Sequence, residues 1–253
     1  MSQSIKISLP LLINIAVFLP AFGIISCVIL SIWYHPHLVT STHCKVKNFL
    51  PSISSASHLP PEIYVWRTCI GIHSGCRYLF GYICYRFYMN AASSSTIPYI
   101  RILIKLNFIC KWTEVTSLVL LSVISSEDNY DYHALSFENF IVCALLHMLM
   151  TCYIFFKLGE VRYNQKNYRS LRMKIILFLS SILSLMLLGY FFWRHNTYCE
   201  PNVYSLFAFF EYVFVFCNIG FHWTCCYDFQ DVHLEALVQG FQYTGLKKST
   251  LDL

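Results

Sequence analysis

The segment that decides the fold is Val65-Trp66-Arg67-Thr68-Cys69-Ile70-Gly71-Ile72-His73-Ser74-Gly75-Cys76-Arg77. It opens an apolar run over residues 62–85 that is long enough to cross a bilayer, yet the segment contains two arginines and a histidine. A charged side chain near the centre of a membrane costs at least about 2.5–3.5 kcal/mol. We therefore expect this segment to form one wall of a polar pocket inside a bundle of helices, where the other helices supply partners for the charges.

The composition of the whole chain indicates a membrane protein. Of the 253 residues, 57% are hydrophobic and only 12% are charged, whereas a soluble domain carries about 25% charged residues. The net charge of +5 comes from basic residues in a few short loops, a pattern that sets the orientation of membrane proteins. We therefore expect no nucleic-acid partner. Most of the twelve cysteines lie in apolar runs, and no CxxC pair indicates a metal site.

Six stretches approach the roughly 20 apolar residues that a membrane-spanning helix requires. They are residues 9–33, 62–85, 98–123, 137–158, 174–193 and 203–226. The first is longer than the apolar region of about 7–15 residues in a cleavable signal peptide, so we interpret it as a membrane helix. The predicted fold is an all-α polytopic membrane protein. Its six-helix transmembrane bundle (9–226) follows a short N-terminal segment (1–8) and precedes a partly helical tail (227–253).

The charges of the loops predict which side of the membrane each end faces. One set of loops, which includes both terminal segments, is rich in Lys and Arg, whereas the opposite set is poorer in them and contains an acidic loop. The positive-inside rule places the basic set, and with it both termini, in the cytosol. The basic set contains Lys6, Arg86, Arg101, Arg162, Lys166, Arg169, Arg172, Lys247 and Lys248.

The loop over residues 34–61 is the longest on the outer side and is rich in Ser, Pro and His. We favour an ordered lumenal cap, with a flexible linker as the alternative. Cys44 in this loop and Cys199 in the fifth loop would face the same oxidising side, where disulfides persist. We therefore predict a Cys44–Cys199 disulfide that ties the cap to the bundle.

Four polar residues on four different predicted helices fall at a similar depth. Counted from the outer ends at about 1.5 Å per residue, they lie roughly 13–18 Å down. They are His73, Glu114, His147 and Glu211. Asn218 and His222 share a stripe of one helix with Glu211, and we expect Arg67 or Arg77 to pair with Glu114 or Glu211.

Three interpretations of this set remain open. The buried pairs could simply hold the helices together. The arginines could bind a lipid phosphate while His and Glu contact hydroxyls. A His–Glu pair could act as a general base in acyl transfer or lipid hydrolysis. A zinc site of His73, His147 and Glu211 has no supporting spacing motif, so we expect no metal. Neither a GxSxG nor an HExxH motif is present.

The segments named above, taken together, resemble the post-GPI-attachment-to-proteins factor 2 family, within the Frag1/DRAM/Sfk1 group. The resemblance covers residues 9–229 in order and at similar spacing. The matching pieces are Thr42-His43-Cys44, Asn48-Phe49-Leu50-Pro51-Ser52-Ile53-Ser54-Ser55-Ala56, Val65-Trp66-Arg67, Gly71-Ile72-His73-Ser74 with Arg77, Leu106-Asn107-Phe108, Glu114, Ser125-Ser126-Glu127-Asp128, Arg194-His195-Asn196-Thr197-Tyr198-Cys199-Glu200, Glu211-Tyr212, Phe221-His222 and Asp228-Phe229.

The resemblance implies a role in the lipid remodelling of GPI-anchored proteins in the Golgi membrane, with the endoplasmic reticulum as an alternative location. The step implied is reacylation of the anchor with a saturated chain after an unsaturated fatty acid has been removed. The implied partners are membrane lipid and GPI-anchored proteins, with an acyl donor or a separate acyltransferase, and no cofactor. Whether the chain is itself the acyltransferase stays open, the alternative being a non-enzymatic lipid-binding scaffold or regulator.

Joining the resemblance to the polar set gives candidate roles for ten residues. The catalytic candidates are His73, Glu211, His147 and Glu114. The candidates for binding the phosphate-bearing substrate are Arg67, Arg77, Arg194, His195, Asn218 and His222.

Overall fold

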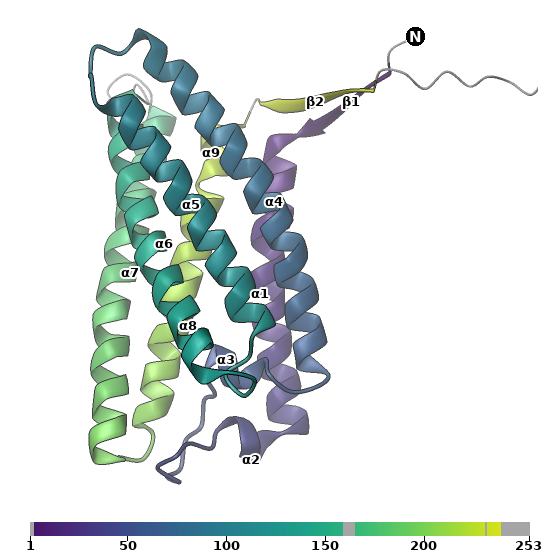
Figure 1. Ribbon diagram of the computed structural model, residues 1–253, viewed down its shortest axis with the longest axis vertical. Helices are drawn as coiled ribbons and strands as arrows, with labels where there is room; N and C mark the ends of the chain where they lie inside the picture. Colours follow the sequence, from purple (N-terminus) through teal and green to yellow (C-terminus); the bar gives the residue numbers. More distant parts are fainter. Residues whose placement is uncertain (1–2, 159–164, 231, 239–253) are drawn as a thin grey trace, which may run out of the picture.

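Six long helices run side by side in the part of the chain that this computed structural model describes, residues 3–158, 165–230 and 232–238 (Figure 1). Each covers all or most of one of the six apolar stretches predicted from the sequence. They are α1 (Leu9–Tyr34), α4 (Glu62–Ala91), α5 (Ile100–Val123), α6 (Tyr130–Leu158), α7 (Gln165–Tyr198) and α8 (Val203–Trp223). Helices suit these stretches because all their backbone hydrogen bonds are made within the segment, as an apolar medium requires.

The helices extend beyond several of the predicted limits. α6 begins at Tyr130 instead of residue 137, α4 continues to Ala91 instead of residue 85, and α7 exceeds residues 174–193 at both ends. The apolar pattern marks the part of a helix that avoids water, and a helix can continue into polar surroundings. As a result, His133 lies in the first turn of α6.

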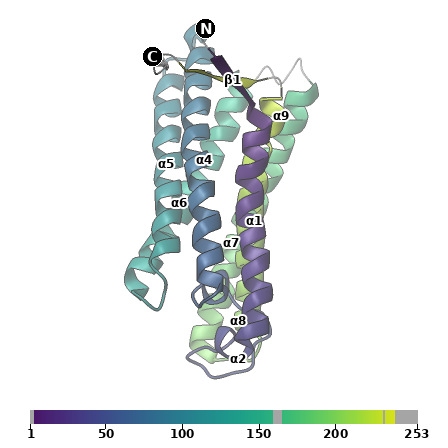
Figure 2. The same cartoon turned by 90° about the vertical axis from the view of Figure 1, so that its right-hand side faces the viewer.

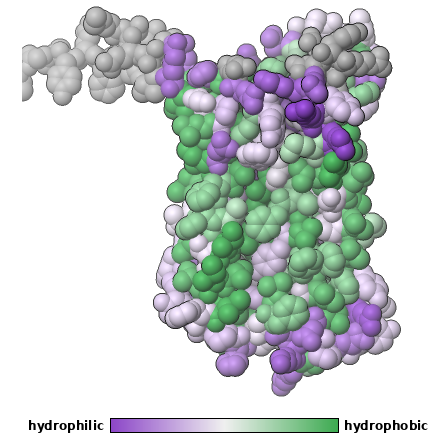
Figure 3. Space-filling model, turned by 180° about the vertical axis from the view of Figure 1, so that it is seen from behind, coloured by the Kyte–Doolittle hydropathy of each residue, from purple (hydrophilic) through white to green (hydrophobic). Residues whose placement is uncertain are grey.

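Five of the described helices are long and apolar enough to cross a membrane, namely α1, α5, α6, α7 and α8 together with the short α9 (Cys225–Asp228). Their outward faces carry large apolar side chains such as Phe18, Leu179 and Met186. Figure 3 shows the result, a broad apolar surface with hydrophilic residues gathered towards both ends. The chain is therefore a helical multi-pass membrane protein.

α4 is not among those five, because it carries more polar and charged residues. It packs between α1 and α5 along the length of the bundle (Figure 2). Two of its charged residues, Glu62 and Arg77, are buried against the other helices. At Gly81 a Cβ atom would lie 3.3 Å from Cγ of Lys111, so the glycine lets α5 approach closely enough to place that lysine in the core.

The tail contains a strand where the sequence analysis predicts partial helix. β2 (His233–Val238) pairs antiparallel with β1 (Gln3–Ser8), with Ser8 opposite His233 and Gln3 opposite Val238. The sequence of β1 alternates polar and apolar residues, which is the period of a strand, and a lone strand needs a partner to satisfy its backbone. This two-stranded sheet is a small addition to the all-α fold that the sequence predicts; residues 239–253 of the predicted tail lie outside the described residues.

The opposite end of the bundle is closed by the cap, which we define as residues 34–61. It is ordered, as predicted, and contains α2 (Pro36–Val39) and α3 (Ile53–Ala56). The Cys44–Cys199 disulfide predicted from the sequence is present and joins the cap to the end of α7. On α8, the Ser205 hydroxyl accepts hydrogen bonds from the backbone N–H groups of Phe49 and Leu50 at 2.9 and 3.1 Å.

We predict that replacing Cys199 with Ser leaves Cys44 free and releases the cap from α7. In non-reduced wild-type protein, Cys44 and Cys199 should resist alkylation and appear as one cross-linked peptide pair in a mass-spectrometric digest. In Cys199→Ser protein, Cys44 should become modified. Cys76→Ser, which removes a thiol from α4, is the matched control and should leave the cross-link unchanged. Alkylation of Cys44 in the unreduced wild type would contradict the prediction.

Candidate functional site

A buried cluster of charges joins α4, α5 and α8 near the middle of the bundle. Arg77 Nη2 lies 2.9 Å from Glu114 Oε1, and the two side chains are 4% and 0% exposed. This is one of the four arginine–glutamate pairs that the sequence analysis allows. Asn218 donates to the same carboxylate oxygen at 3.0 Å. The cluster therefore satisfies a negative charge with partners from two neighbouring helices.

His222 lies between two cations of this cluster. Its Nε2 is 2.6 Å from Arg77 Nη2 and 3.4 Å from Glu114 Oε1, and its Nδ1 is 2.8 Å from Lys111 Nζ. A neutral imidazole has one acceptor nitrogen, so only one of the two cations can donate to the ring in a given tautomer. The cluster is mostly paired from within, but Arg77 Nε and Glu114 Oε2 have no hydrogen-bond partner among the described residues.

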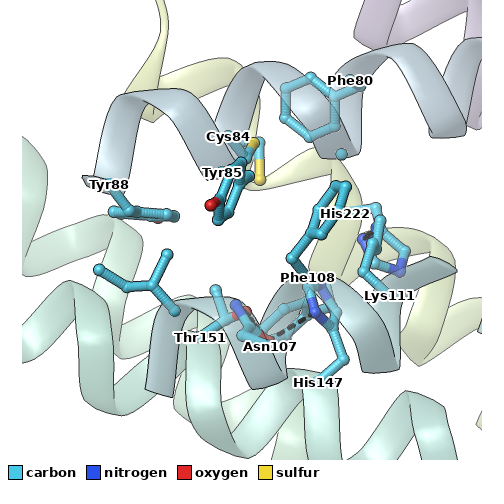
Figure 4. Close-up of a pocket in the computed structure, with 14 residues that line it drawn as sticks. Phe80, Cys84, Tyr85, Tyr88, Asn107, Phe108, Lys111, His147, Thr151 and His222 are labelled. Atoms are coloured by element: carbon cyan, nitrogen blue, oxygen red, sulfur yellow. Dashed lines mark hydrogen bonds between the residues drawn. The ribbon is translucent and has the colours of Figure 1, made fainter. Parts of the chain in front are cut away.

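His147 extends the cluster to α6. Its Nδ1–H donates to Asn107 Oδ1 at 2.8 Å, and Asn107 in turn donates to Thr151 at 3.1 Å. The rings of His147 and His222 stack with their centroids 5.6 Å apart. Figure 4 shows these side chains around a cavity of about 30 Å³, which has room for roughly one or two waters. This inner cavity is too small for a lipid.

Ligand atoms of Glu114, His147 and His222 lie within 4.8 Å of one another, the closeness that a shared metal ion would require. However, Arg77 lies against both the His222 ring and the Glu114 carboxylate, and Lys111 lies against the other nitrogen of the His222 ring. Two cations at the ligand atoms oppose the binding of a third. The donor set therefore fits a hydrogen-bonded charge network better than a metal centre.

The other two catalytic candidates lie apart from this cluster. His73 Nδ1–H donates to the backbone carbonyl of Ala16 on α1, and the side chain is 4% exposed. Glu211 accepts a 2.8 Å hydrogen bond at Oε2 from the backbone N–H of Ile53 in the cap. Both residues line a second cavity of about 60 Å³, which Arg77 and Asn218 also line. Of the four catalytic candidates, the structure thus brings Glu114 and His147 close together. His73 and Glu211 line the same cavity, but no hydrogen bond between them is seen.

A third and larger cavity, about 350 Å³, lies at the capped end between α3, α6, α7 and α8. We call it the outer cavity. Its polar lining includes Tyr130, His133 and Glu211, and its apolar lining includes Leu188 and Phe192. Gly189 also lines it, and nothing lies within 4 Å of where a Cβ atom would stand. α6 and α7 diverge towards this end of the bundle (Figure 1).

Ser54, His133, Phe137 and Glu211 line both the outer cavity and the 60 Å³ cavity behind it. These four side chains therefore stand at the boundary between a space large enough for a ligand and the enclosed polar interior. Of the four, only Glu211 belongs to the set predicted from the sequence.

Three further candidates lie at the capped end, and two of them, Arg67 and Arg194, have hydrogen-bond partners within the chain. Arg67, about one-third exposed, donates to the carbonyls of Ser122 and Val123 at the end of α5, at 3.3 and 2.7 Å. Arg194 donates two hydrogen bonds to the Glu200 carboxylate, at 2.5 and 2.9 Å. His195 is 1% exposed, and neither ring nitrogen has a hydrogen-bond partner among the described residues.

Sequence reasoning missed Lys111, Ser54 and His133. Lys111 carries a usable signal, because a lysine inside the apolar stretch 98–123 needs a partner by the argument applied to Arg77. Ser54 falls in the segment 34–61, which the sequence analysis treats as a loop, and His133 precedes the apolar run of its helix. Neither has a local spacing pattern that could have identified it.

The model of the Frag1/DRAM/Sfk1/Cwh43P N-terminal domain matches residues 8–232. The chain belongs to this family. Post-GPI attachment to proteins factor 2 from Caenorhabditis elegans is 38% identical over 214 residues, which is 83% of this chain and 81% of that protein. Acyltransferase PGAP2 from Xenopus tropicalis is 36% identical over 226 residues, 86% of each chain. No solved structure matches the chain.

We predict that Arg77→Met destabilises the protein by about 3–5 kcal/mol, because it leaves the Glu114 carboxylate buried without its cation. The double variant Arg77→Met/Glu114→Met should recover part of that loss. Both can be measured by denaturant unfolding in detergent. Arg67→Met is the control and should change stability far less, since its acidic partner Asp128 is exposed. Equal losses in the single and double variants would show that the two residues do not interact.

The Arg194–Glu200 pair gives a prediction about pH. Hydrogen bonds from Arg194 lower the pKa of Glu200 below its ordinary value of 4.5. A carboxylate with a lowered folded-state pKa stabilises the fold above its unfolded pKa, and that contribution is lost as the pH falls through the folded-state pKa. The difference in Tm between wild type and Glu200→Gln should therefore be constant above about pH 5 and shrink below about pH 4.5.

The control for this pH series is Glu127→Gln, which removes another exposed carboxylate from the same end of the molecule. If the difference in Tm between wild type and Glu200→Gln were the same at pH 3 as at neutral pH, the lowered pKa of Glu200 would not be the cause.

Proposed function

We propose that the protein remodels the lipid of GPI-anchored proteins by acylating the lyso-GPI anchor with a saturated fatty acid. Its partners are then GPI-anchored proteins and an acyl donor, and its location is the Golgi membrane. Support comes from the family, whose members include proteins named for post-GPI attachment and for acyl transfer, and from the outer cavity. A factor that only binds lipid for a separate acyltransferase is the alternative.

The observation that carries the proposal is the combination of size, lining and position in the outer cavity. Its volume of about 350 Å³ falls in the range of about 300–1,000 Å³ that is usual for small-molecule sites. The lining is polar near the cap and apolar along Leu188 and Phe192. This is the division that a lipid requires, with its glycerol and headgroup at one end and its acyl chain at the other.

In this proposal α4 is a sixth membrane-spanning helix, both termini are cytosolic, and the cap is lumenal. α4 has the length to span, with 30 residues, and Glu62 and Arg77 are buried against protein. The described terminal strands lie together at the end of the bundle opposite the cap (Figure 1), as an even number of spans requires. The disulfide in the cap agrees with an oxidising compartment.

The candidate residues then divide into two groups by depth. In this proposal Glu211, which lines the outer cavity, stands beside the hydroxyl that is acylated. Arg67, Arg194 and His195 lie at the same end of the molecule outside that cavity, and we assign them to the phosphate-bearing headgroup. Arg194 must exchange Glu200 for the phosphate in order to bind it. The inner residues position α4, α5, α6 and α8 around the site without touching substrate, because the two cavities among them, of about 30 and 60 Å³, are too small for a lipid. They are His73, Arg77, Glu114, His147, Asn218 and His222.

We predict that wild-type protein, purified into lipid vesicles, transfers a labelled saturated acyl chain to lyso-GPI. Gly189→Phe should abolish or strongly reduce the transfer, because the ring would fill the space that the chain occupies. The variant should still fold, since that space is open in the structure. Gly71→Phe is the matched control, because Gly71 is also exposed and has nothing within 4 Å of its Cβ position, but does not line the cavity.

The same assay separates the two functions. Transfer by wild type and by Gly71→Phe, but not by Gly189→Phe, supports an acyltransferase that uses the outer cavity. Binding of lyso-GPI without any transfer by the purified wild type would instead support a factor that serves a separate enzyme. Loss of transfer in both glycine variants, with folded protein, would remove the outer cavity from the proposal.

A further inference from the structure

A serine and a histidine face each other at the boundary between the outer cavity and the polar interior. Ser54 Oγ, on α3, lies 2.9 Å from His133 Nε2, on α6. The other ring nitrogen, His133 Nδ1, is 2.7 Å from the backbone carbonyl oxygen of Ile124. A carbonyl oxygen only accepts, so Nδ1 carries the proton and Nε2 is left as the acceptor for the Ser54 hydroxyl.

This arrangement has the geometry of an activated nucleophile. A serine hydroxyl is a weak nucleophile unless an adjacent base takes its proton, and the base must be held in the right tautomer by a third group. His133 is the adjacent base, and the Ile124 carbonyl fixes its tautomer in the place that a carboxylate takes in a Ser-His-Asp triad. His133 is 9% exposed, while Ser54 keeps partial access to the cavity.

The short helix that carries Ser54 is held firmly from both sides. Glu211 accepts from the N–H of Ile53 at 2.8 Å, and the Ser52 side chain accepts from the N–H of Ser55 at 3.1 Å. The Tyr204 hydroxyl donates to Ser52 at 3.1 Å. α3 is therefore fixed against α8, so the direction of Ser54 towards His133 is set before any ligand arrives.

We propose that Ser54 is the nucleophile and His133 the general base of the acyl transfer, so that the acyl group passes through a covalent ester on Ser54. This inference rests on the proposed function and deepens it. The substrate class is a fatty acyl donor whose carbonyl is bound to a sulfur or oxygen leaving group, such as an acyl thioester or a phospholipid ester.

The two half-reactions balance. In the first, Ser54 Oγ forms a bond to the donor carbonyl carbon, the bond to the leaving group breaks, and the Ser54 proton passes through His133 Nε2 to the leaving group. In the second, the free hydroxyl of lyso-GPI attacks the ester carbonyl and gives its proton to Nε2. The bond to Ser54 Oγ then breaks, and that oxygen recovers the proton from Nε2.

A structural role for the pair, tying the cap to α6, makes a different prediction from a chemical one. Ser54→Ala removes only a hydroxyl that is already partly exposed, so a structural role predicts a small change in stability and retained transfer. The chemical role predicts a folded protein that has lost at least ~100-fold in transfer rate. Ser55→Ala is the matched control, because this neighbouring hydroxyl accepts from Ser52 and faces no histidine.

The decisive experiment looks for the acyl group on the protein itself. Full-length wild type in vesicles is incubated without lyso-GPI, in one arm with a labelled saturated acyl thioester and in the other with a phospholipid carrying the labelled chain. Peptide mass spectrometry should find the chain on Ser54 in the arm that contains the true donor. The label should be absent in Ser54→Ala and retained in Ser55→Ala.

Two further variants test the assigned roles. Ser54→Cys should carry the chain as a thioester that neutral hydroxylamine cleaves, whereas the wild-type ester resists it. His133→Asn keeps a donor for the Ile124 carbonyl but removes the base, so it should lower acylation of Ser54 at least ~100-fold at neutral pH. Correct folding of each variant is checked by the Cys44–Cys199 cross-link.

The outcomes also separate this inference from the proposed function. Transfer to lyso-GPI that survives in Ser54→Ala would overturn the covalent route and leave the function standing. Acylated Ser54 with no transfer to lyso-GPI would support the pair and overturn the proposed acceptor. A wild type with no chain on Ser54 in either arm would overturn the inference, whatever its transfer activity.

Discussion

The buried ion pair between Arg77 and Glu114 is the constraint on which the arrangement of the bundle depends. In an apolar medium neither charge can be left without a partner, because the free energy of an isolated buried ion is prohibitive. By itself, this pair would fix only the position of α4 relative to α5. Asn218 and His222 bind the same carboxylate, so the register of α8 is fixed as well. Such pairs contribute little net stability after desolvation, and their value lies in the specificity of packing.

That register reaches the capped end of the molecule through α8. Glu211 and Asn218 are seven residues apart, close to two helical turns, and therefore lie on the same face about 10 Å from each other. Once Asn218 is fixed on Glu114, Glu211 must face the cap, where it receives the N–H of Ile53. The position of α3 is thus determined by an ion pair that α3 does not touch. The outer cavity and the enclosed charge cluster are two consequences of one helix register.

The sequence could predict features that depend on residue type, but not features that depend on how each helix is rotated about its own axis. The lengths of the apolar stretches were enough to locate all six helices. The rule that buried charges must pair led to four possible Arg–Glu pairs, and the observed Arg77–Glu114 pair is one of them. Which histidine joins the pair depends on the rotation of each helix about its axis, which a 3.6-residue period leaves open, so His222 and Lys111 were not foreseen there. β1 and β2 are far apart in sequence, and each forms a strand only because the other is available. Ser54 and His133 meet only after α3 is folded.

The separation between the inner cluster and the outer cavity has a chemical reason under the proposed function. A charge network that must keep its internal proton balance is disturbed by a ligand that brings or removes charge, so a closed space of about 30 Å³ protects it. An acyl chain, in contrast, needs an open path from the bilayer, which Gly189 leaves between α6 and α7. The reacting carbonyl must stand where these two environments meet, beside apolar walls for the chain and fixed hydrogen-bonding groups for the transfer. Ser54, His133 and Glu211 stand between the outer cavity and the 60 Å³ cavity, which Arg77 and Asn218 of the charge cluster also line.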